Sequence, residues 1–170
     1  MGSSYQHRYP EFGEGNHLPV LIRCLLLTDG PVLEMGMGIS SSPAMHWLCA
    51  PRKRELVSYE SNKRWFDFAK DFEDDFHRVF CIEDWNTAEI ERPWDVVLVD
   101  HEPSRRRSID IMRLANHAKY IVIHDSQGRS NHYTHFDRIW PLFKWQYNYD
   151  VFETKTTVVS NLVDLTNFQV

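Results

Sequence analysis

An apolar strand, a glycine-rich turn and a helix start follow one another early in the chain, and this order limits the folds it can adopt. Residues 32–35 are mostly apolar and predict a short strand that leads into Gly36 and Gly38. A helical segment is expected after Ser40. Because glycine has no Cβ and tolerates positive φ, the backbone of this turn can approach a ligand closely. The carboxylate of Glu34 repels a pyrophosphate and suits an ammonium group, so the turn favours an amino-acid-bearing nucleoside over a dinucleotide.

The composition indicates a single globular domain. The chain has 170 residues, 42% of them hydrophobic, which is enough to bury a substantial core without disulfides. We expect residues 1–16 to be a flexible N-terminal segment and residues 17–170 to form the domain. The formal net charge of −5 argues against nucleic acid as a partner, because nucleic-acid binders normally carry a basic face.

The cysteines and the apolar runs indicate a cytoplasmic protein. Cys24, Cys49 and Cys81 lack C-x-x-C spacing and lie among apolar residues, so we expect buried thiols in a reducing compartment. No apolar run approaches the roughly 18 residues that a membrane-spanning helix needs, so no membrane partner is expected.

Strands and helices alternate along most of the chain, which predicts an α/β fold. The apolar residues of segment 94–99 run without alternation, as in a strand buried on both faces of a parallel sheet. The last two strands are too close for a crossover helix and predict an antiparallel hairpin. We therefore expect a doubly wound, mostly parallel seven-stranded sheet with an antiparallel C-terminal hairpin strand and helices on both faces. The expected strands are 32–35, 55–59, 78–82, 94–99, 118–123, 145–153 and 156–161, and the expected helices are 17–28, 43–49, 62–72, 106–115 and 133–142.

Polar residues follow the second and third expected strands, at the sheet edge where open α/β sheets bind their ligands. Glu60 suits the two hydroxyls of a ribose. Asp84 suits the amino group of an adenine, and Trp85 suits stacking on the base. Together with the glycine-rich turn, these residues predict a nucleoside-binding site.

Two aspartates and two histidines follow the fourth and fifth expected strands, Asp100 with His101 and His124 with Asp125. Neighbouring strands would bring all four into one small region. Histidine is suited to remove a proton near neutral pH, so His101 or His124 is a candidate general base, oriented by an aspartate. In the alternative interpretation, Asp100, Asp125 and a histidine bind a divalent cation that lowers the pKa of a substrate hydroxyl.

With these motifs, residues 17–165 resemble the class I S-adenosylmethionine-dependent methyltransferases, which have a Rossmann-like domain. Glu34 followed by Gly36 and Gly38 matches the first motif of that family, and Ser40 takes the place of its usual third glycine. The late hairpin matches the seventh, antiparallel strand of the family. The resemblance implies methyl transfer as the activity and S-adenosylmethionine as the cofactor.

The resemblance also implies roles for single residues. The backbone around Gly36 and Gly38 would face the methionine part of the cofactor, with Glu34 near its amino group. Glu60 would hold the ribose hydroxyls and Asp84 the edge of the adenine.

The resemblance bears on the reacting centre as well. The ends of the fourth and fifth strands are similar to those of metal-dependent catechol-type O-methyltransferases, although Ser126 stands where those enzymes have asparagine. The Asn/Asp-Pro-Pro-Tyr motif of DNA adenine and glutamine methyltransferases is absent after the fourth strand. We therefore expect a small-molecule acceptor that is methylated at oxygen.

Two further segments concern partners. The basic run at residues 105–107 suits an anionic acceptor, or else is a solvated part of the surface. Four late aromatic residues offer a homodimer surface, or else pack at the sheet edge: Trp140, Trp145, Tyr147 and Tyr149.

Two alternative functions remain open from the sequence. One is an NAD-dependent oxidoreductase, although its G-x-G-x-x-G phosphate loop is poorly matched here. The other is a non-catalytic S-adenosylmethionine-binding protein or partner subunit, which would bind the cofactor without turnover.

Overall fold

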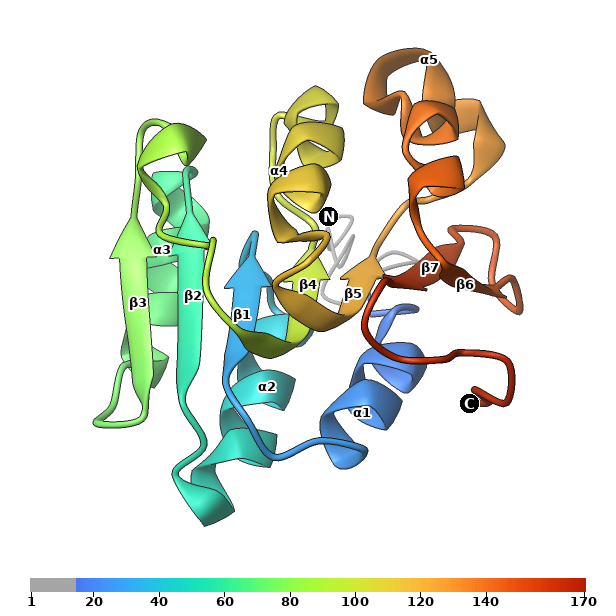
Figure 1. Ribbon diagram of the computed structural model, residues 1–170. Helices are drawn as coiled ribbons and strands as arrows, with labels where there is room; N and C mark the ends of the chain where they lie inside the picture. The colour runs from blue at the N-terminus through green and yellow to red at the C-terminus, as the bar shows by residue number, and fades with distance from the viewer. Residues whose placement is uncertain (1–14) are drawn as a thin grey trace, which may run out of the picture.

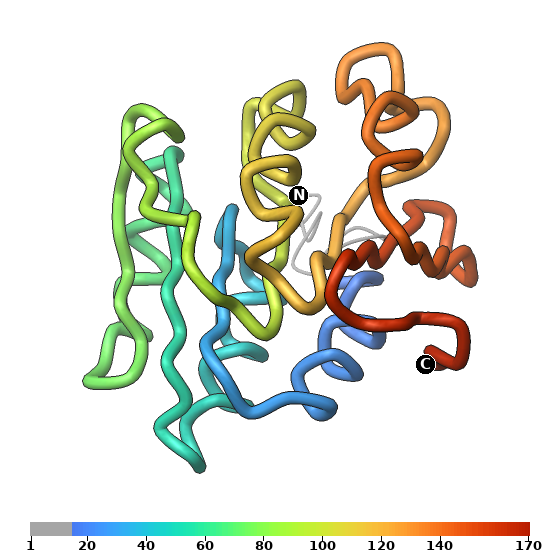
Figure 2. Tube along the Cα trace, in the orientation of Figure 1, coloured from blue at the N-terminus to red at the C-terminus, as the bar shows by residue number. Residues whose placement is uncertain are grey.

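The computed structural model describes residues 15–170, which contain a seven-stranded mixed sheet (Figures 1 and 2). The strands are β1 (Val32–Met35), β2 (Leu56–Glu60), β3 (His77–Cys81), β4 (Trp94–Val99), β5 (Ala118–Ile123), β6 (Trp145–Tyr149) and β7 (Thr156–Ser160). Their order is β3-β2-β1-β4-β5-β7-β6, with the first five parallel and β7 antiparallel to both β5 and β6. This topology confirms the predicted fold class.

The central strands β1, β4 and β5 form because most of their residues are apolar and both faces of the sheet are covered. Every residue of β1, β2, β4 and β7 is buried. Successive side chains of a strand point to opposite faces, so Leu33 and Met35 pack in one core cluster and Val32 packs in the other. The sheet therefore separates two hydrophobic cores, as doubly wound folds require.

Helices cover both faces of the sheet (Figure 1). Val20 and Leu21 of the first helix and Met45 of the second belong to the core cluster on one face, whereas Ile111 and Leu114 of the fourth belong to the cluster on the other. The helices are α1 (Leu18–Leu26), α2 (Ser41–Cys49), α3 (Lys63–Ala69), α4 (Arg107–Leu114) and α5 (Asn131–Thr134).

The predicted helix at 133–142 is wrong. The structure has α5 followed by two 3₁₀ turns, η6 (Phe136–Arg138) and η7 (Trp140–Leu142). His135 ends α5 in the left-handed region at φ 56°, and Pro141 lacks the N–H that a continuing helix needs.

Several smaller predictions are also corrected. The strand predicted at 145–153 ends at Tyr149, where the chain bends. Cys24 and Cys49 are buried as expected, but Cys81 is exposed because it ends β3, which lies at the edge of the sheet. The four late aromatic residues are partly buried against the two core clusters, so packing accounts for them, and the homodimer stays a prediction.

Two features concern the ends and the surface. Most of the segment predicted to be flexible, residues 1–14, lies outside the described residues. Its last two residues, Gly15 and Asn16, are placed and lie next to the site described below. Between residues 15 and 170, no helix has both the length and the apolar character needed to cross a membrane.

Candidate functional site

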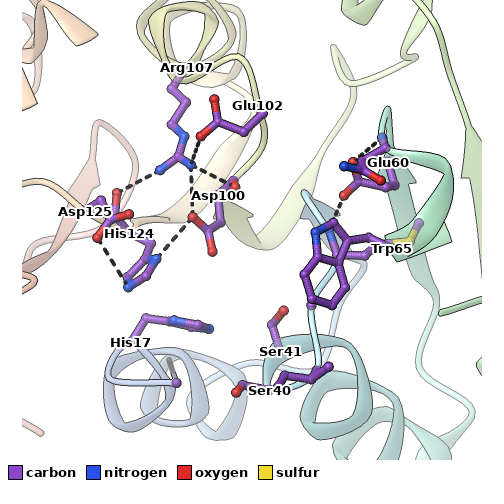
Figure 3. A pocket seen from close by; sticks show the side chains of 15 residues that line it. His17, Ser40, Ser41, Glu60, Trp65, Asp100, Glu102, Arg107, His124 and Asp125 are labelled. Carbon is purple, nitrogen blue, oxygen red and sulfur yellow. Dashed lines mark hydrogen bonds and ion pairs between the residues drawn. The ribbon is translucent and has the colours of Figure 1, made fainter. Parts of the chain in front are cut away.

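A cavity of about 470 Å³ lies at the carboxyl ends of the parallel strands (Figure 3). This edge is where open α/β sheets bind ligands, because the loops that follow neighbouring strands diverge there. Six of the residues singled out in the sequence line the cavity: Gly38, Ser40, Glu60, Asp100, His124 and Asp125. Five others do not line it: Glu34, Gly36, Asp84, Trp85 and His101.

The two glycines of the turn after β1 have different reasons to be glycine. Gly36 has φ +90°, and a Cβ there would lie 2.6 Å from the carbonyl carbon of Asp100 and from the nitrogen of His101. Gly36 therefore allows two loops of the chain to pack closely. A Cβ on Gly38 would meet only Ser41 Oγ, at 3.7 Å, so the space above Gly38 is open to the cavity.

Glu34 lies beneath the turn and not in the cavity. Its side chain is fully buried and accepts hydrogen bonds from Ser42 Oγ at 2.9 Å and Ser58 Oγ at 2.7 Å. Burial raises the pKa of Glu34 to about 7, although the serine hydrogen bonds oppose the shift. Ser42 Oγ in turn accepts the N–H of Gly38 at 3.1 Å. Glu34 thus supports the turn from inside the sheet.

Glu60 is held at the cavity wall by backbone groups. One carboxylate oxygen accepts the N–H of Met37 at 2.8 Å, and the other accepts those of Ser61 and Asn62 at 2.7 and 2.6 Å. These bonds tie the end of β2 to the turn after β1. The indole of Trp65, from α3, also lines the cavity near Glu60 (Figure 3).

Asp100 and His124 form a pair across the ends of β4 and β5. His124 Nδ1 lies 3.1 Å from Asp100 Oδ1. Burial opposes ionisation of both groups, but their mutual hydrogen bond and charge outweigh it, so the pKa of His124 is raised and that of Asp100 is lowered. Asp125, at φ 54°, places its Oδ1 3.7 Å from His124 Nε2.

Arg107 holds this pair in place. Its guanidinium donates hydrogen bonds to the carbonyl oxygens of His101, His124 and Asp100 at 2.7, 3.3 and 2.9 Å, and Nη2 lies 3.1 Å from Asp100 Oδ1. Because Arg107 is only 3% exposed, the interpretation of residues 105–107 as a solvated run is wrong for this residue. Its donors are engaged by the protein itself.

Two residues of the site come from the start of the described chain and were missed in the sequence. The ring of His17, just before α1, lies 4.6 Å from that of His124. Burial and the nearby His124 lower the pKa of His17 to about 4. Asn16 Oδ1 lies 2.7 Å from His124 Nε2. No local pattern marks these residues, because their partners lie more than 80 residues later in the chain.

The remaining predicted residues lie elsewhere. Trp85 is 4% exposed, packs against the ring of His101 and donates its Nε1–H to the carbonyl of Glu102. His101 is 1% exposed, and its Nε2 lies 3.0 Å from Asp110 Oδ2. Asp84 is exposed and accepts the N–H of Asn86 at 2.9 Å, capping a 3₁₀ turn. None of these three residues lines the cavity itself, and the roles expected for them stay predictions.

One group of side chains has the composition and spacing of a metal site. Ligand atoms of His17, Asp100 and His124 all lie within 4.8 Å of one another. The group shares Asp100 with the cation site expected from the sequence, and Asp125 is not part of it.

Comparisons with known proteins support the fold. No family model and no curated protein sequence matches the chain. Solved structures of methyltransferases do match, at 10–11% identity. SAH-bound PaMTH1 of Podospora anserina has a TM-score of 0.63, with 84% of this chain and 76% of that chain covered. The N-terminal domain of human METTL16 has a TM-score of 0.60, with 94% and 74% covered, and a human methyltransferase 10 domain containing protein has 0.59, with 89% and 84% covered. The chain has the methyltransferase fold.

Proposed function

We propose that this chain is an S-adenosylmethionine-dependent methyltransferase that acts on a small molecule at oxygen. The observation that carries the proposal is the cavity, which lies at the carboxyl edge of a sheet with the methyltransferase strand order. One of the similar structures is bound to SAH, the demethylated form of this cofactor.

The residues present fit such a cofactor. The volume of about 470 Å³ lies within the range of small-ligand sites. The open space above Gly38 admits a ligand against the backbone, and Ser40 lies on the same wall. The fixed carboxylate of Glu60 suits two ribose hydroxyls. When bound, the cofactor supplies an electrophilic methyl group.

The Asp100–His124 pair is the candidate for removing a proton from the acceptor. Asp100 is partly exposed and lines the cavity, so its carboxylate can reach a bound hydroxyl. His124 and Arg107 fix the direction of that carboxylate. We place the acceptor oxygen at this end of the cavity, with Asp125 on the same wall.

Calorimetric titration with S-adenosylmethionine, SAH and NAD tests the cofactor. We expect binding of the first two and not of NAD. Gly38→Val fills the open space above the turn and is expected to weaken binding at least about tenfold, an energy of about 1.4 kcal/mol. Gly128→Val is the matched control, because a Cβ on Gly128 meets no atom within 4 Å and Gly128 does not line the cavity.

Binding of NAD alone would replace the proposal with the oxidoreductase. Equal cofactor affinities in the two glycine variants would show that the cofactor does not bind in this cavity.

Turnover separates an enzyme from a non-catalytic binder. Asp100→Asn should lower methyl transfer to a hydroxyl acceptor by about 10²-fold while SAH affinity changes little. Cofactor binding without transfer to any small-molecule hydroxyl would favour the non-catalytic alternative.

A further inference from the structure

Three side chains from three separate elements converge at one end of the cavity. His17 precedes α1, Asp100 follows β4 and His124 follows β5. Figure 3 shows the two imidazoles and the carboxylate directed toward a common region. Their ligand atoms lie within 4.8 Å of one another, and His124 Nδ1 and Asp100 Oδ1 are already 3.1 Å apart. Ligand atoms at about 2.1 Å from one ion in tetrahedral geometry lie about 3.4 Å from each other.

His17 is the unusual member of this group. The residue is 4% exposed, and neither Nδ1 nor Nε2 has a hydrogen-bond partner among residues 15–170. Leaving a buried polar atom without a partner costs roughly 1–3 kcal/mol. An imidazole that lines a cavity with a free nitrogen is therefore matched to a ligand that the nitrogen can coordinate.

The surroundings of His124 and Asp100 also suit coordination. Asn16 Nδ2 donates to the carbonyl of Thr154 at 3.0 Å, which turns Asn16 Oδ1 toward His124 Nε2. A carbonyl-type oxygen at that nitrogen holds a proton on Nε2, as the outer partners of metal-bound histidines do, so that an ion can replace the proton that Nδ1 shares with Asp100. The contacts of Asp100 with His124 and Arg107 use Oδ1, so among the described residues Oδ2 has no such contact.

We propose that His17, Asp100 and His124 bind one divalent transition-metal ion of the Zn²⁺ type. Two imidazoles and one carboxylate suit zinc and its transition-metal neighbours, whereas magnesium and calcium prefer oxygen ligands. Three protein ligands leave at least one coordination position open, and the group lines the cavity. That position is available to an oxygen or nitrogen atom of a bound molecule.

Titration of the metal-free protein with Co²⁺, followed by visible absorption, tests the site directly. We expect one equivalent to bind with the absorption band of four- or five-coordinate cobalt, and one equivalent of Zn²⁺ to displace it. Mg²⁺ in excess should leave the band unchanged. His17→Ala and His124→Ala should abolish the band, and Asn16→Ala should weaken affinity by about 10–100-fold.

Controls separate the site from adventitious binding and from misfolding. His132→Ala removes an exposed histidine outside the cavity and should bind Co²⁺ as the parent does. His17→Asp keeps a ligand-forming side chain, so it should retain binding with a shifted band if the protein stays folded. Binding that His17→Ala leaves unchanged, or no one-to-one binding in the folded parent, would overturn the proposal. Because the titration needs neither cofactor nor acceptor, it can succeed or fail independently of cofactor binding. An ion held by Asp100 would take the place of the proton-accepting role proposed for that carboxylate, by lowering the pKa of the acceptor hydroxyl instead.

Discussion

At the scale of single residues, similar amino acids serve different purposes around one turn. Gly36 permits the turn to pack on the loop after β4, whereas Gly38 opens the cavity. Two acidic residues near them also differ, because Glu34 is enclosed in the sheet and Glu60 faces the ligand space. The sequence predicts that this turn is important, but the pattern alone does not separate packing from binding.

The two glycines should respond differently to alanine. Gly36→Ala should lower the free energy of unfolding by more than about 1 kcal/mol, because a Cβ at φ +90° is strained and would lie 2.6 Å from the backbone of Asp100. Gly38→Ala should change it by less than about 1 kcal/mol, since its Cβ meets only an ordinary contact. Urea unfolding measures the free energy of unfolding of both variants. Equal losses in the two would contradict the different roles given to Gly36 and Gly38.

Glu34 should make stability depend on pH. Its pKa is about 7 in the folded protein against a reference value of 4.5, so the folded state retains a proton that the unfolded chain releases. This contribution to the free energy of unfolding is complete below pH 4.5 and is lost as the pH rises through 7. Between pH 5 and 8 the parent should lose on the order of a few kcal/mol of its free energy of unfolding through this group, and Glu34→Gln should not show that loss.

Thermal unfolding of the parent and of Glu34→Gln across that range measures the difference. Glu73→Gln is the control, because Glu73 is exposed on the surface. Parallel curves for the parent and Glu34→Gln would show that the buried carboxyl does not carry the dependence.

At the scale of elements, strands were predicted better than helices. Six of the seven strands agree within about one residue at each end, because short stretches rich in apolar and β-branched residues lie between clear turn signals. The helix at 133–142 failed because His135 turns the chain through a left-handed residue that the apolar spacing does not indicate. The residues at strand ends in the cavity were predicted from topology. His17 lines the cavity, and Asn16 contacts His124, only through long-range packing.

Arg107, at the start of α4, holds together the segments that follow β4 and β5, so its replacement should weaken this edge of the sheet. Arg107→Lys keeps the charge but cannot reproduce the donors shared among the carbonyls of Asp100, His101 and His124. We expect the free energy of unfolding to fall by at least about 2 kcal/mol. Arg105→Lys, at an exposed neighbouring residue, should change it by less than about 0.5 kcal/mol. Comparable losses in the two variants would contradict this role of Arg107.

At the scale of the whole molecule, the sheet separates two cores and gathers its ligand-facing loops at one edge (Figure 1). The residues of the two cores alternate along the same strands. The helices on both faces of the sheet therefore pack against one shared set of strands. The cavity lies at this edge, and residues from five separate segments of the chain line it.

The overall charge provides a further test of the acceptor class. A formal net charge of −5 repels the phosphates of nucleic acids, which bind proteins chiefly through basic residues. We expect no binding of single-stranded or duplex RNA or DNA at about 150 mM salt in a fluorescence-anisotropy titration. Salt-dependent binding in that titration would overturn the small-molecule acceptor.

The position of β7 between β5 and β6 has a consequence for synthesis on the ribosome. β6 emerges before β7 but pairs only with it, so the nascent chain carries an unpaired strand and an open edge on β5 until β7 appears. Thr154, which orients Asn16, emerges just before β7. The ribosome must therefore synthesise almost all of the described residues before the site can assemble. Until then, the exposed strand edges favour chaperone binding over activity.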